Sequence, residues 1–357
     1  MDGMLAGLRV LDLSLWQPGH TATQLLADLG ADVLKIEPPG GDRERIMPDR
    51  VANYYGNKRS LVLDLKREED RAKLLELAKD AEVVVEGSRP GVADRLGAGY
   101  AQLSAVNPAL VYCSISGFGQ TGPLAMAPGH EHNYQAYTGA FTYPEQGGEP
   151  VAAKPLVGDQ GSGITAAFAI LAAVLCARRT GQGEYIDVAM ADVILYCVAP
   201  SGTIGEQAPA GHKNKPPAMG EFATSDGGYV VLGVFSEDHF WDKLCQALGL
   251  DTHVGVKMAE RDRRSAELRA DLVAAVSKRP RDELVTELAR AGVPIAPVLT
   301  REEGLSHPHF WERGVVARGP DGDRRIAHPI RYKNRPALPP ARPAEIGEGG
   351  DLGFSKR

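Results

Sequence analysis

The sequence predicts an α/β protein with a doubly wound parallel sheet, followed by a second, smaller α/β unit. In the first half, short apolar strand-like segments alternate with helix-like segments, and such alternation gives parallel pairing through right-handed crossovers. The chain has 357 residues, a length typical of about two domains at roughly 150 residues each. The expected strands are residues 8–13, 32–36, 60–65, 81–86 and 110–115, and the expected helices between them include 21–29 and 67–79.

A long helix is expected at residues 161–179, where the sequence is apolar on all sides. Such a helix is buried, and its alanines allow close packing by neighbouring elements. Arg178, Arg179 and Gly181 supply a basic last turn and a glycine stop. The uninterrupted apolar run covers the fourteen residues 164–177, which is shorter than the ~20 residues needed to cross a bilayer. We therefore expect no membrane span.

Composition divides the chain into four parts. We expect a large domain at residues 1–190 and a linker at 191–220, where Gly, Pro, Ala and Lys occur without a period. A small α/β domain is expected at 221–312, with a strand near 229–232, three helices between 238 and 291, and a closing strand near 293–298. The remaining segment, 313–357, contains four prolines at 336–343 and should run over a surface.

The overall charge argues against nucleic acid and anionic membranes as partners. There are 40 basic and 46 acidic residues, giving a net charge of -6, so no basic surface of the whole chain is predicted. The four cysteines are scattered without a C-x-x-C pair, which predicts free thiols in a reducing compartment. The N-terminus has no basic segment followed by an apolar one. We expect a cytoplasmic protein.

Residues 117–122, Gly-Phe-Gly-Gln-Thr-Gly, match the G-x-G-x-x-G pattern after a predicted strand. A dinucleotide site also needs a helix to open there. Pro123 follows at once, and no acidic residue ends a next strand ~20 residues on. We interpret the motif as a tight glycine loop at the carboxyl edge of the sheet, where ligands bind in this fold class.

Residues 129–134, Gly-His-Glu-His-Asn-Tyr, gather groups that carry chemistry. Imidazole is suited to moving protons near neutral pH. A polar loop with ordinary surface histidines is the alternative. Because His130 and His132 have no evident distant partner, no metal site is predicted.

Asp159 directly precedes the long helix, between Gly158 and the glycines at 161 and 163. One interpretation is an N-cap, in which the carboxylate accepts free helix amides. The other is a reactive base or nucleophile, since the glycines let a ligand approach closely. Glu237 lies before an aromatic-rich helix start, and first-turn acidity explains it locally.

Basic residues near the predicted strand ends are candidates for holding phosphate, although most should be solvated surface charges. Arg89 and Arg95 flank Pro90-Gly91 immediately after a strand, where the guanidinium fork is effective. The other candidates are Lys58, Arg59 and Lys66.

The chain resembles the class III CoA-transferase family, of the CaiB/BaiF type, which includes formyl-CoA transferases and α-methylacyl-CoA racemases. The stretches that carry the resemblance are residues 5–13, 26–33, 36–39, 57–60, 86–92 and 117–123. The resemblance implies a large Rossmann-like domain and a small α/β domain. It also implies an interlocked homodimer in which the segment 313–357 returns to the large domain.

The same resemblance assigns roles to residues. In the family's transferases, the aspartate that Asp159 matches attacks the acyl-CoA, giving a mixed anhydride and then an aspartyl-CoA thioester. In its racemases, that aspartate faces a histidine in a Gly-His-Asp-x-Asn-Tyr motif, which His130 matches, while Glu131 departs from the motif's Asp. Glu237 falls where racemases place a glutamate that orients the histidine.

We therefore expect first a racemase that inverts a 2-methylacyl-CoA by proton transfer between His130 and Asp159. CoA transfer through Asp159 is the alternative, favoured by residues 236–244, which look transferase-like. Amides of the loop around Asp159 are the candidates to stabilise an enolate oxygen. CoA is expected as part of the substrate, with no prosthetic group. The residues expected to hold it are Lys58, Asp64, Lys66, Arg89, Arg95 and Gly129.

Overall fold

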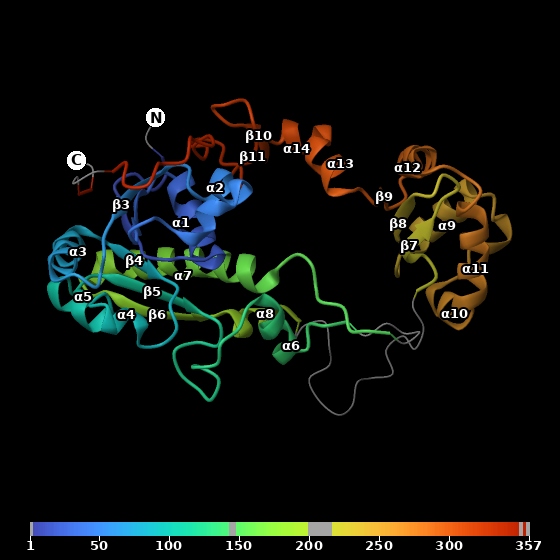
Figure 1. Cartoon of the computed structure of the whole chain (residues 1–357). Coiled ribbons are helices and arrows are strands. Elements are labelled where there is room, and N and C mark those ends of the chain that lie inside the picture. Colours follow the sequence, from blue (N-terminus) through green and yellow to red (C-terminus); the bar gives the residue numbers. More distant parts are fainter. Residues whose placement is uncertain (1–2, 143–147, 199–215, 350–352, 355–357) are drawn as a thin grey trace. The chain divides into compact units, whose positions relative to one another are not determined.

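The computed structural model describes residues 3–142, 148–198, 216–349 and 353–354. The chain divides into two compact units. The first comprises Met1–Thr203 and Pro308–Arg357, and the second comprises Ile204–His307. Each unit is described by itself (Figure 1).

The first unit is built on a six-stranded parallel sheet in the order β3-β2-β1-β4-β5-β6. This is the standard order of a doubly wound sheet, with its topological switch point between β1 and β4. The predicted α/β class with a parallel sheet is confirmed. The strands are β1 (Arg9–Asp12), β2 (Asp32–Glu37), β3 (Lys58–Val62), β4 (Val83–Glu86), β5 (Val111–Ser116) and β6 (Glu184–Ala189). The sixth strand was not predicted.

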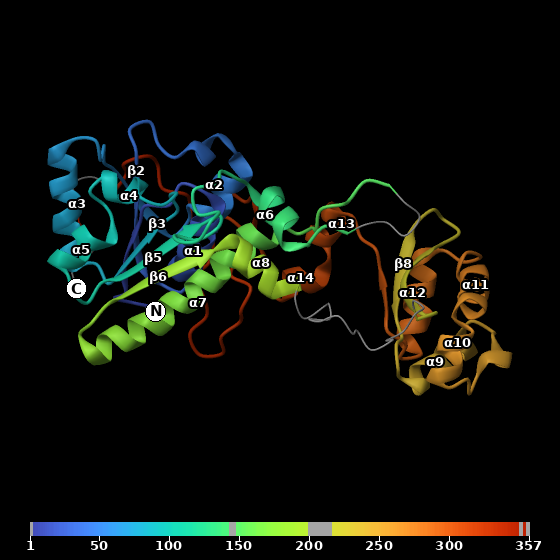
Figure 2. The same cartoon turned by 90° about the horizontal axis from the view of Figure 1, so that it is seen from below.

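Helices cover both faces of this sheet, and each face has its own apolar core. On one face, α1 (Gln17–Asp28) packs against α7 (Val157–Thr180), and their side chains join those of β1, β4 and β5 in the first core. On the other face, α3 (Glu68–Asp80) and α5 (Tyr100–Val106) cover the second core, with α4 (Val92–Arg95) beside them (Figure 2).

Short elements surround the carboxyl edge of the sheet. They are the 3₁₀ helix η1 (Arg43–Ile46), α2 (Pro48–Tyr54), α6 (Glu131–Thr138) and α8 (Met190–Val198). Helix α8 extends into the predicted linker, because its Met190, Ala191 and Ile194 are buried in the first core. The rest of that predicted linker, residues 199–215, lies outside the described residues.

Helix α7 differs from the expected buried helix. It begins at Val157 rather than at 161, and one side is exposed: Ile164, Phe168 and Leu175 are 56%, 74% and 71% accessible. The helix is long and apolar enough to cross a membrane by length and composition alone. That is weak evidence for a span, because α7 packs on α1 and on β5 and β6, and core helices of soluble proteins pass the same test.

The second unit packs helices on a small antiparallel sheet. The sheet has the order β7-β8-β9, with β7 (Met219–Ala223), β8 (Tyr229–Gly233) and β9 (Ile295–Pro297). Its core centres on Trp241, which is fully buried. The helical elements are α9 (Asp238–Ala247), η3 (Asp251–His253), α10 (Met258–Arg263), α11 (Ser265–Val276), α12 (Arg281–Arg290) and α13 (Arg301–Ser306).

The chain then continues in the first unit from Pro308. Helix α14 (Pro308–Glu312) precedes a hairpin of β10 (Val316–Arg318) and β11 (Arg324–Ile326). The last described residues run along the edge strand β3, where the Gly349 amide donates to the Ser60 carbonyl at 2.7 Å and Arg59 donates to the Gly353 carbonyl at 2.9 Å. The tail thus covers one edge of the sheet.

Candidate active site

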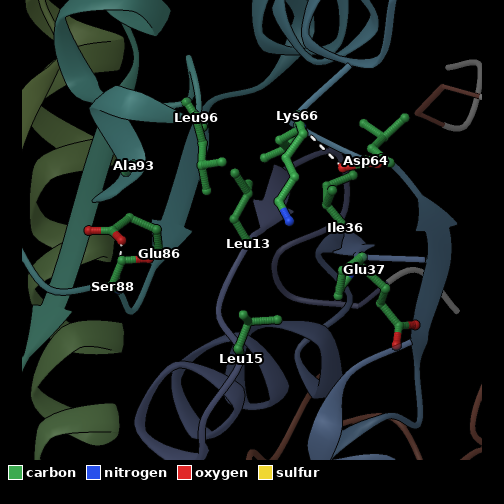
Figure 3. A pocket seen from close by; sticks show the side chains of 14 residues that line it. Leu13, Leu15, Ile36, Glu37, Asp64, Lys66, Glu86, Ser88, Ala93 and Leu96 are labelled. Carbon is green, nitrogen blue, oxygen red and sulfur yellow. Dashed lines mark hydrogen bonds between the residues drawn. The ribbon is translucent and has the colours of Figure 1, made fainter. Parts of the chain in front are cut away.

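A pocket opens at the carboxyl ends of β1, β2, β3 and β4 (Figure 3), with a cavity volume of about 160 Å³. It spans the switch point of the sheet, the place where open α/β sheets bind ligands. Its walls are mainly apolar and its polar groups are few. The lining residues include Leu13, Leu15, Ile36, Asp64, Lys66, Glu86, Ser88 and Leu96.

Two predicted CoA-binding residues, Asp64 and Lys66, line this pocket. The Asp64 carboxylate accepts the Lys66 amide at 3.1 Å, which closes a tight turn after β3. In Figure 3 the Lys66 side chain points into the pocket between apolar side chains, so its ammonium is aimed at any anionic group bound there.

Asp159 lies in the first turn of α7 and is partly buried. It does not cap the helix, so that interpretation is wrong. Glu131 supplies the cap instead: its carboxylate accepts the amide of Gly158 at 2.9 Å and the amide of Asp159 at 2.8 Å. Glu131 is itself buried and also accepts Gln135 Nε2 at 2.7 Å. The carboxylate of Asp159 makes no hydrogen bond to any described residue.

This arrangement also changes the expected oxyanion donors. The amides of Gly158 and Asp159 are bound to Glu131, and the Gln160 amide donates to the Leu156 carbonyl at 3.0 Å. None of these three amides is therefore free to stabilise an enolate oxygen, contrary to expectation.

The surroundings make Asp159 a weaker acid than a free aspartate. Burial, then the negative charge of Glu131, raise its pKa to about 6, while the positive charges of Arg50 and His130 act in the opposite direction. A carboxylate with this pKa is mostly ionised at neutral pH and more basic than usual. Such a group can serve as a nucleophile or as a base.

His130 is exposed immediately before α6. Its ring meets the ring of Trp16 edge-on, with centroids 6.2 Å apart, and its amide donates to Asn133 Oδ1 at 3.0 Å. Gly129 accepts the Tyr134 hydroxyl, and a side chain at 129 would lie within 2.7 Å of that ring. The motif therefore forms a rigid entry to α6 beside Asp159.

Lys58 contacts protein groups in this fold. It is the first residue of β3, and its ammonium is buried, 2.8 Å from Thr23 Oγ1 and 3.2 Å from Asp12 Oδ2. Burial lowers its pKa to about 8. Lys58 starts the strand, whereas ligands meet the carboxyl ends of strands in this fold class, and its expected role in holding CoA stays a prediction.

The remaining predicted residues are not among those that line the pocket of Figure 3. Arg89 lines a neighbouring pocket of about 260 Å³ that shares Glu86 with it. Arg95 is an exposed residue at the end of α4. Glu237 belongs to the second unit, directly before α9, and accepts the Phe235 amide at 3.2 Å. Its expected role toward His130 stays a prediction.

A buried ionic network that the sequence did not predict includes His20 of α1. His20 is fully buried with its Nδ1 at 2.9 Å from Glu44 and its Nε2 at 2.9 Å from Asp42. Lys35 lies 3.2 Å from the same oxygen of Asp42 and 3.7 Å from Asp12. Glu44 extends the network outward to Arg50 at 2.6 Å. No local sequence signal marks these residues as partners.

Together, the fold and the site define a doubly wound α/β protein with a partly buried carboxylate in the first turn of α7 and a pocket at the carboxyl edge of its parallel sheet. The chain belongs to the CoA-transferase family III, which its residues 5–348 match. The resemblance that its motifs indicate is thus confirmed.

Three relatives illustrate the range of the family. The chain is 36% identical to the acetyl-CoA:oxalate CoA-transferase of Acetobacter aceti, over 88% of this chain and 85% of that protein. It is 31% identical to the human alpha-methylacyl-CoA racemase, over 94% of this chain and 88% of that protein. A CaiB/BaiF family protein from Brucella suis superposes with a TM-score of 0.85 at 29% identity, covering 98% of both chains.

Proposed function

We propose that this protein is a CoA-transferase that moves CoA from an acyl-CoA to a carboxylic acid through Asp159. The observation that carries the proposal is the Asp159 carboxylate, held in place by its backbone yet bound by no described side chain. Racemisation was expected first, but greater similarity to a transferase than to a racemase supports transfer, 36% against 31%. Transfer therefore replaces racemisation as the main hypothesis.

The proposed reaction needs only acyl substitutions at one side chain. An Asp159 oxygen attacks the thioester carbonyl carbon, the C–S bond breaks, and CoA leaves as a thiolate from a mixed anhydride. The thiolate then attacks the aspartyl carbonyl carbon and releases the first carboxylic acid as its carboxylate. The acceptor carboxylate attacks this aspartyl-CoA thioester, expels the thiolate, and forms a second anhydride. Attack of the thiolate on the acceptor's carbonyl gives the new acyl-CoA and frees Asp159.

The environment of Asp159 suits this role. Its pKa of about 6 leaves the carboxylate mostly ionised at pH 7 while making it more basic than an ordinary aspartate. The anchored amide keeps the residue from swinging away when the anhydride and thioester form on it. Holding reacting groups in one geometry is itself a large part of catalysis.

We propose that the pocket of Figure 3 binds part of the CoA moiety of the substrate. No separate prosthetic group is proposed. The apolar walls of the pocket suit a planar ring, and Lys66 suits a phosphate. Arg89 lines the adjoining pocket and offers a second cation. We also propose that CoA contacts Arg95 and Gly129, and that Glu237 orients His130.

We also propose that the protein forms a homodimer in the cytoplasm. The exposed apolar residues Ile164, Phe168 and Leu175 of α7 support a second copy as partner, because exposed apolar patches commonly mark association sites. The free state of all four cysteines supports a reducing compartment.

Mass spectrometry tests the proposed reaction. The protein is incubated with a panel of acyl-CoAs in deuterated buffer, with and without free carboxylic acids. We expect new acyl-CoAs only when an acid is present, and a CoA adduct on Asp159. Asp159→Ala should abolish both, whereas Asp192→Ala should not, because Asp192 is an exposed residue in the first turn of α8. Deuterium at the α-carbon without acid, together with no transfer, would establish racemisation instead.

A further inference from the structure

The first turn of α7 is tied to α1 and α2 by the side chain of Gln160, the residue that directly follows Asp159. Gln160 Nε2 donates to the hydroxyl of Tyr54, the last residue of α2, at 2.6 Å. Gln160 Oε1 accepts the hydroxyl of Thr21 in α1 at 3.4 Å. Both ends of this one amide are therefore bound, each by a different helix.

Tyr54 is itself held by a second amide. Its hydroxyl also accepts Gln17 Nε2 at 3.3 Å, and Gln17 is the buried first residue of α1. A hydroxyl oxygen has two lone pairs, so the two amides use both of them. Tyr54 and Gln160 are partly buried, where a hydrogen bond is stronger than in water. The tyrosine thus links the beginnings of α1 and α7.

The backbones of α1 and α7 also approach closely here. A Cβ atom at Gly163 would lie 2.5 Å from Thr21 Cβ and 2.6 Å from the Pro18 carbonyl oxygen. Only a residue without a side chain fits at such distances. The start of α7 is therefore pressed against the start of α1, which brings Gln160 within reach of Thr21.

These contacts matter because the Asp159 carboxylate makes no hydrogen bond to any described residue, so its position depends on the backbone of the first turn. Glu131 holds that turn through the amides of Gly158 and Asp159. Gln160 holds it through Tyr54. Anchored residues thus lie on both sides of Asp159 in the sequence.

We propose that Tyr54 is a positioning residue for the reaction at Asp159: by binding Gln160, it fixes the direction from which the carboxylate attacks the thioester. The inference rests on the proposed CoA transfer and deepens it. Tyr54 is not among the residues that line the pocket of Figure 3, so its hydroxyl should affect the chemical step rather than the binding of CoA. Misplacement of a reacting group by about 1 Å can cost about 100-fold in rate, and the loss of one of two anchors should cost less.

Rapid-quench mass spectrometry measures how fast the CoA adduct forms on Asp159 and how much of it finally accumulates. The substrate is the acyl-CoA that labels the wild type most completely. Tyr54→Phe removes only the hydroxyl. It should slow adduct formation about 10-fold and leave the KM for the acyl-CoA and the final amount of adduct nearly unchanged. A purely structural role would instead lower the amount of active protein and leave the rate constant of the active fraction unaltered.

A second variant assigns the effect to the hydrogen bond. Gln160→Leu removes the same bond from its other end and should slow adduct formation at least as much. The double variant should react as slowly as Gln160→Leu alone, because one bond is lost only once. Tyr137→Phe is the matched control: it removes the hydroxyl of an exposed tyrosine in α6 and should leave the rate unchanged.

The outcomes separate this inference from the proposed function. If the wild type forms no adduct on Asp159, the proposed function itself fails. If the wild type forms the adduct and Tyr54→Phe forms it equally fast, only the role of Tyr54 is overturned. Effects that multiply in the double variant, or less adduct at an unchanged rate, also overturn it. Circular dichroism checks the fold of each variant, and if Tyr54→Phe does not fold, Gln160→Leu decides by the same criteria.

Discussion

Glu131 accepts the backbone amide of Asp159 at 2.8 Å, while its negative charge helps to raise the pKa of the Asp159 side chain to about 6. One buried carboxylate thus does two things to its neighbour. It fixes the backbone of the proposed nucleophile, and it makes the carboxylate of that residue more basic. Glu131 is accordingly a positioning residue, because it reaches Asp159 only through the backbone and the electric field.

Replacing Glu131 by Gln should therefore move the pH dependence of the reaction. The variant loses the like charge, so the pKa of Asp159 falls and the acid limb of the kcat profile moves to lower pH. The Gln carbonyl oxygen still accepts an amide, which preserves part of the anchor. Stopped assays of acyl exchange from pH 4 to 8 measure the shift. An acid limb that stays near pH 6 would contradict the coupling.

Asp159→Asn should stabilise the fold, with an effect that depends on pH. The folded pKa of about 6 lies above the ordinary 3.8, so stability is lost as pH rises from about 4 to 6, and the ionised carboxylate is unfavourable above that range. Two pKa units set an upper limit of about 3 kcal/mol, and partial exposure reduces this to about 1–2 kcal/mol.

Thermal unfolding of the wild type and of Asp159→Asn at pH 4 and pH 8 checks this. The variant should unfold at a higher temperature at pH 8 and at nearly the same temperature at pH 4. A gain of equal size at both values would assign the effect to packing rather than to charge.

Much of the first sheet was predictable because its strands are short apolar runs between polar helices. Strand β6 escaped because Glu184 and Asp187 interrupt its apolar pattern. Its first four residues lie partly exposed at the edge of the sheet, where only β5 pairs with it. Its identity as a strand comes from that pairing, which no local pattern encodes.

The sequence singles out Asp159 as a candidate residue, but it does not show the contacts of that residue. Asp159 stands out by its glycines, yet the start of α7 depends on Glu131, 28 residues earlier. Lys58 shows the same limit, since its side chain contacts Asp12, from another strand. Partners that come together only in the folded chain leave no spacing to recognise.

His20→Ala should destabilise the first unit strongly. The imidazole lies 2.9 Å from both Asp42 and Glu44, all three side chains being buried. Removing it leaves two buried carboxylates without the ring nitrogens that face them. Loss of one partner of a buried ion pair typically lowers the free energy of unfolding by about 3–5 kcal/mol. Chemical denaturation followed by circular dichroism measures the loss. His132→Ala, an exposed site on α6, is the control, and an equal effect of both variants would disprove the network's importance.

Lys66→Ala should weaken CoA binding without disturbing the fold, because Lys66 contributes its ammonium to the pocket and its backbone to the turn with Asp64. Loss of one partly exposed charge-assisted contact predicts about a 3- to 10-fold rise in the Kd of CoA. The difference from the wild type should shrink at high salt, since screening weakens an exposed charge pair. Calorimetric titration with CoA at low and high salt measures both effects.

Lys79→Ala is the matched control and should leave the Kd unchanged. It removes an exposed lysine in the last turn of α3, which is paired only with Glu76 in the described structure. Equal affinity of the wild type and Lys66→Ala at low salt would place the phosphates of CoA away from this pocket.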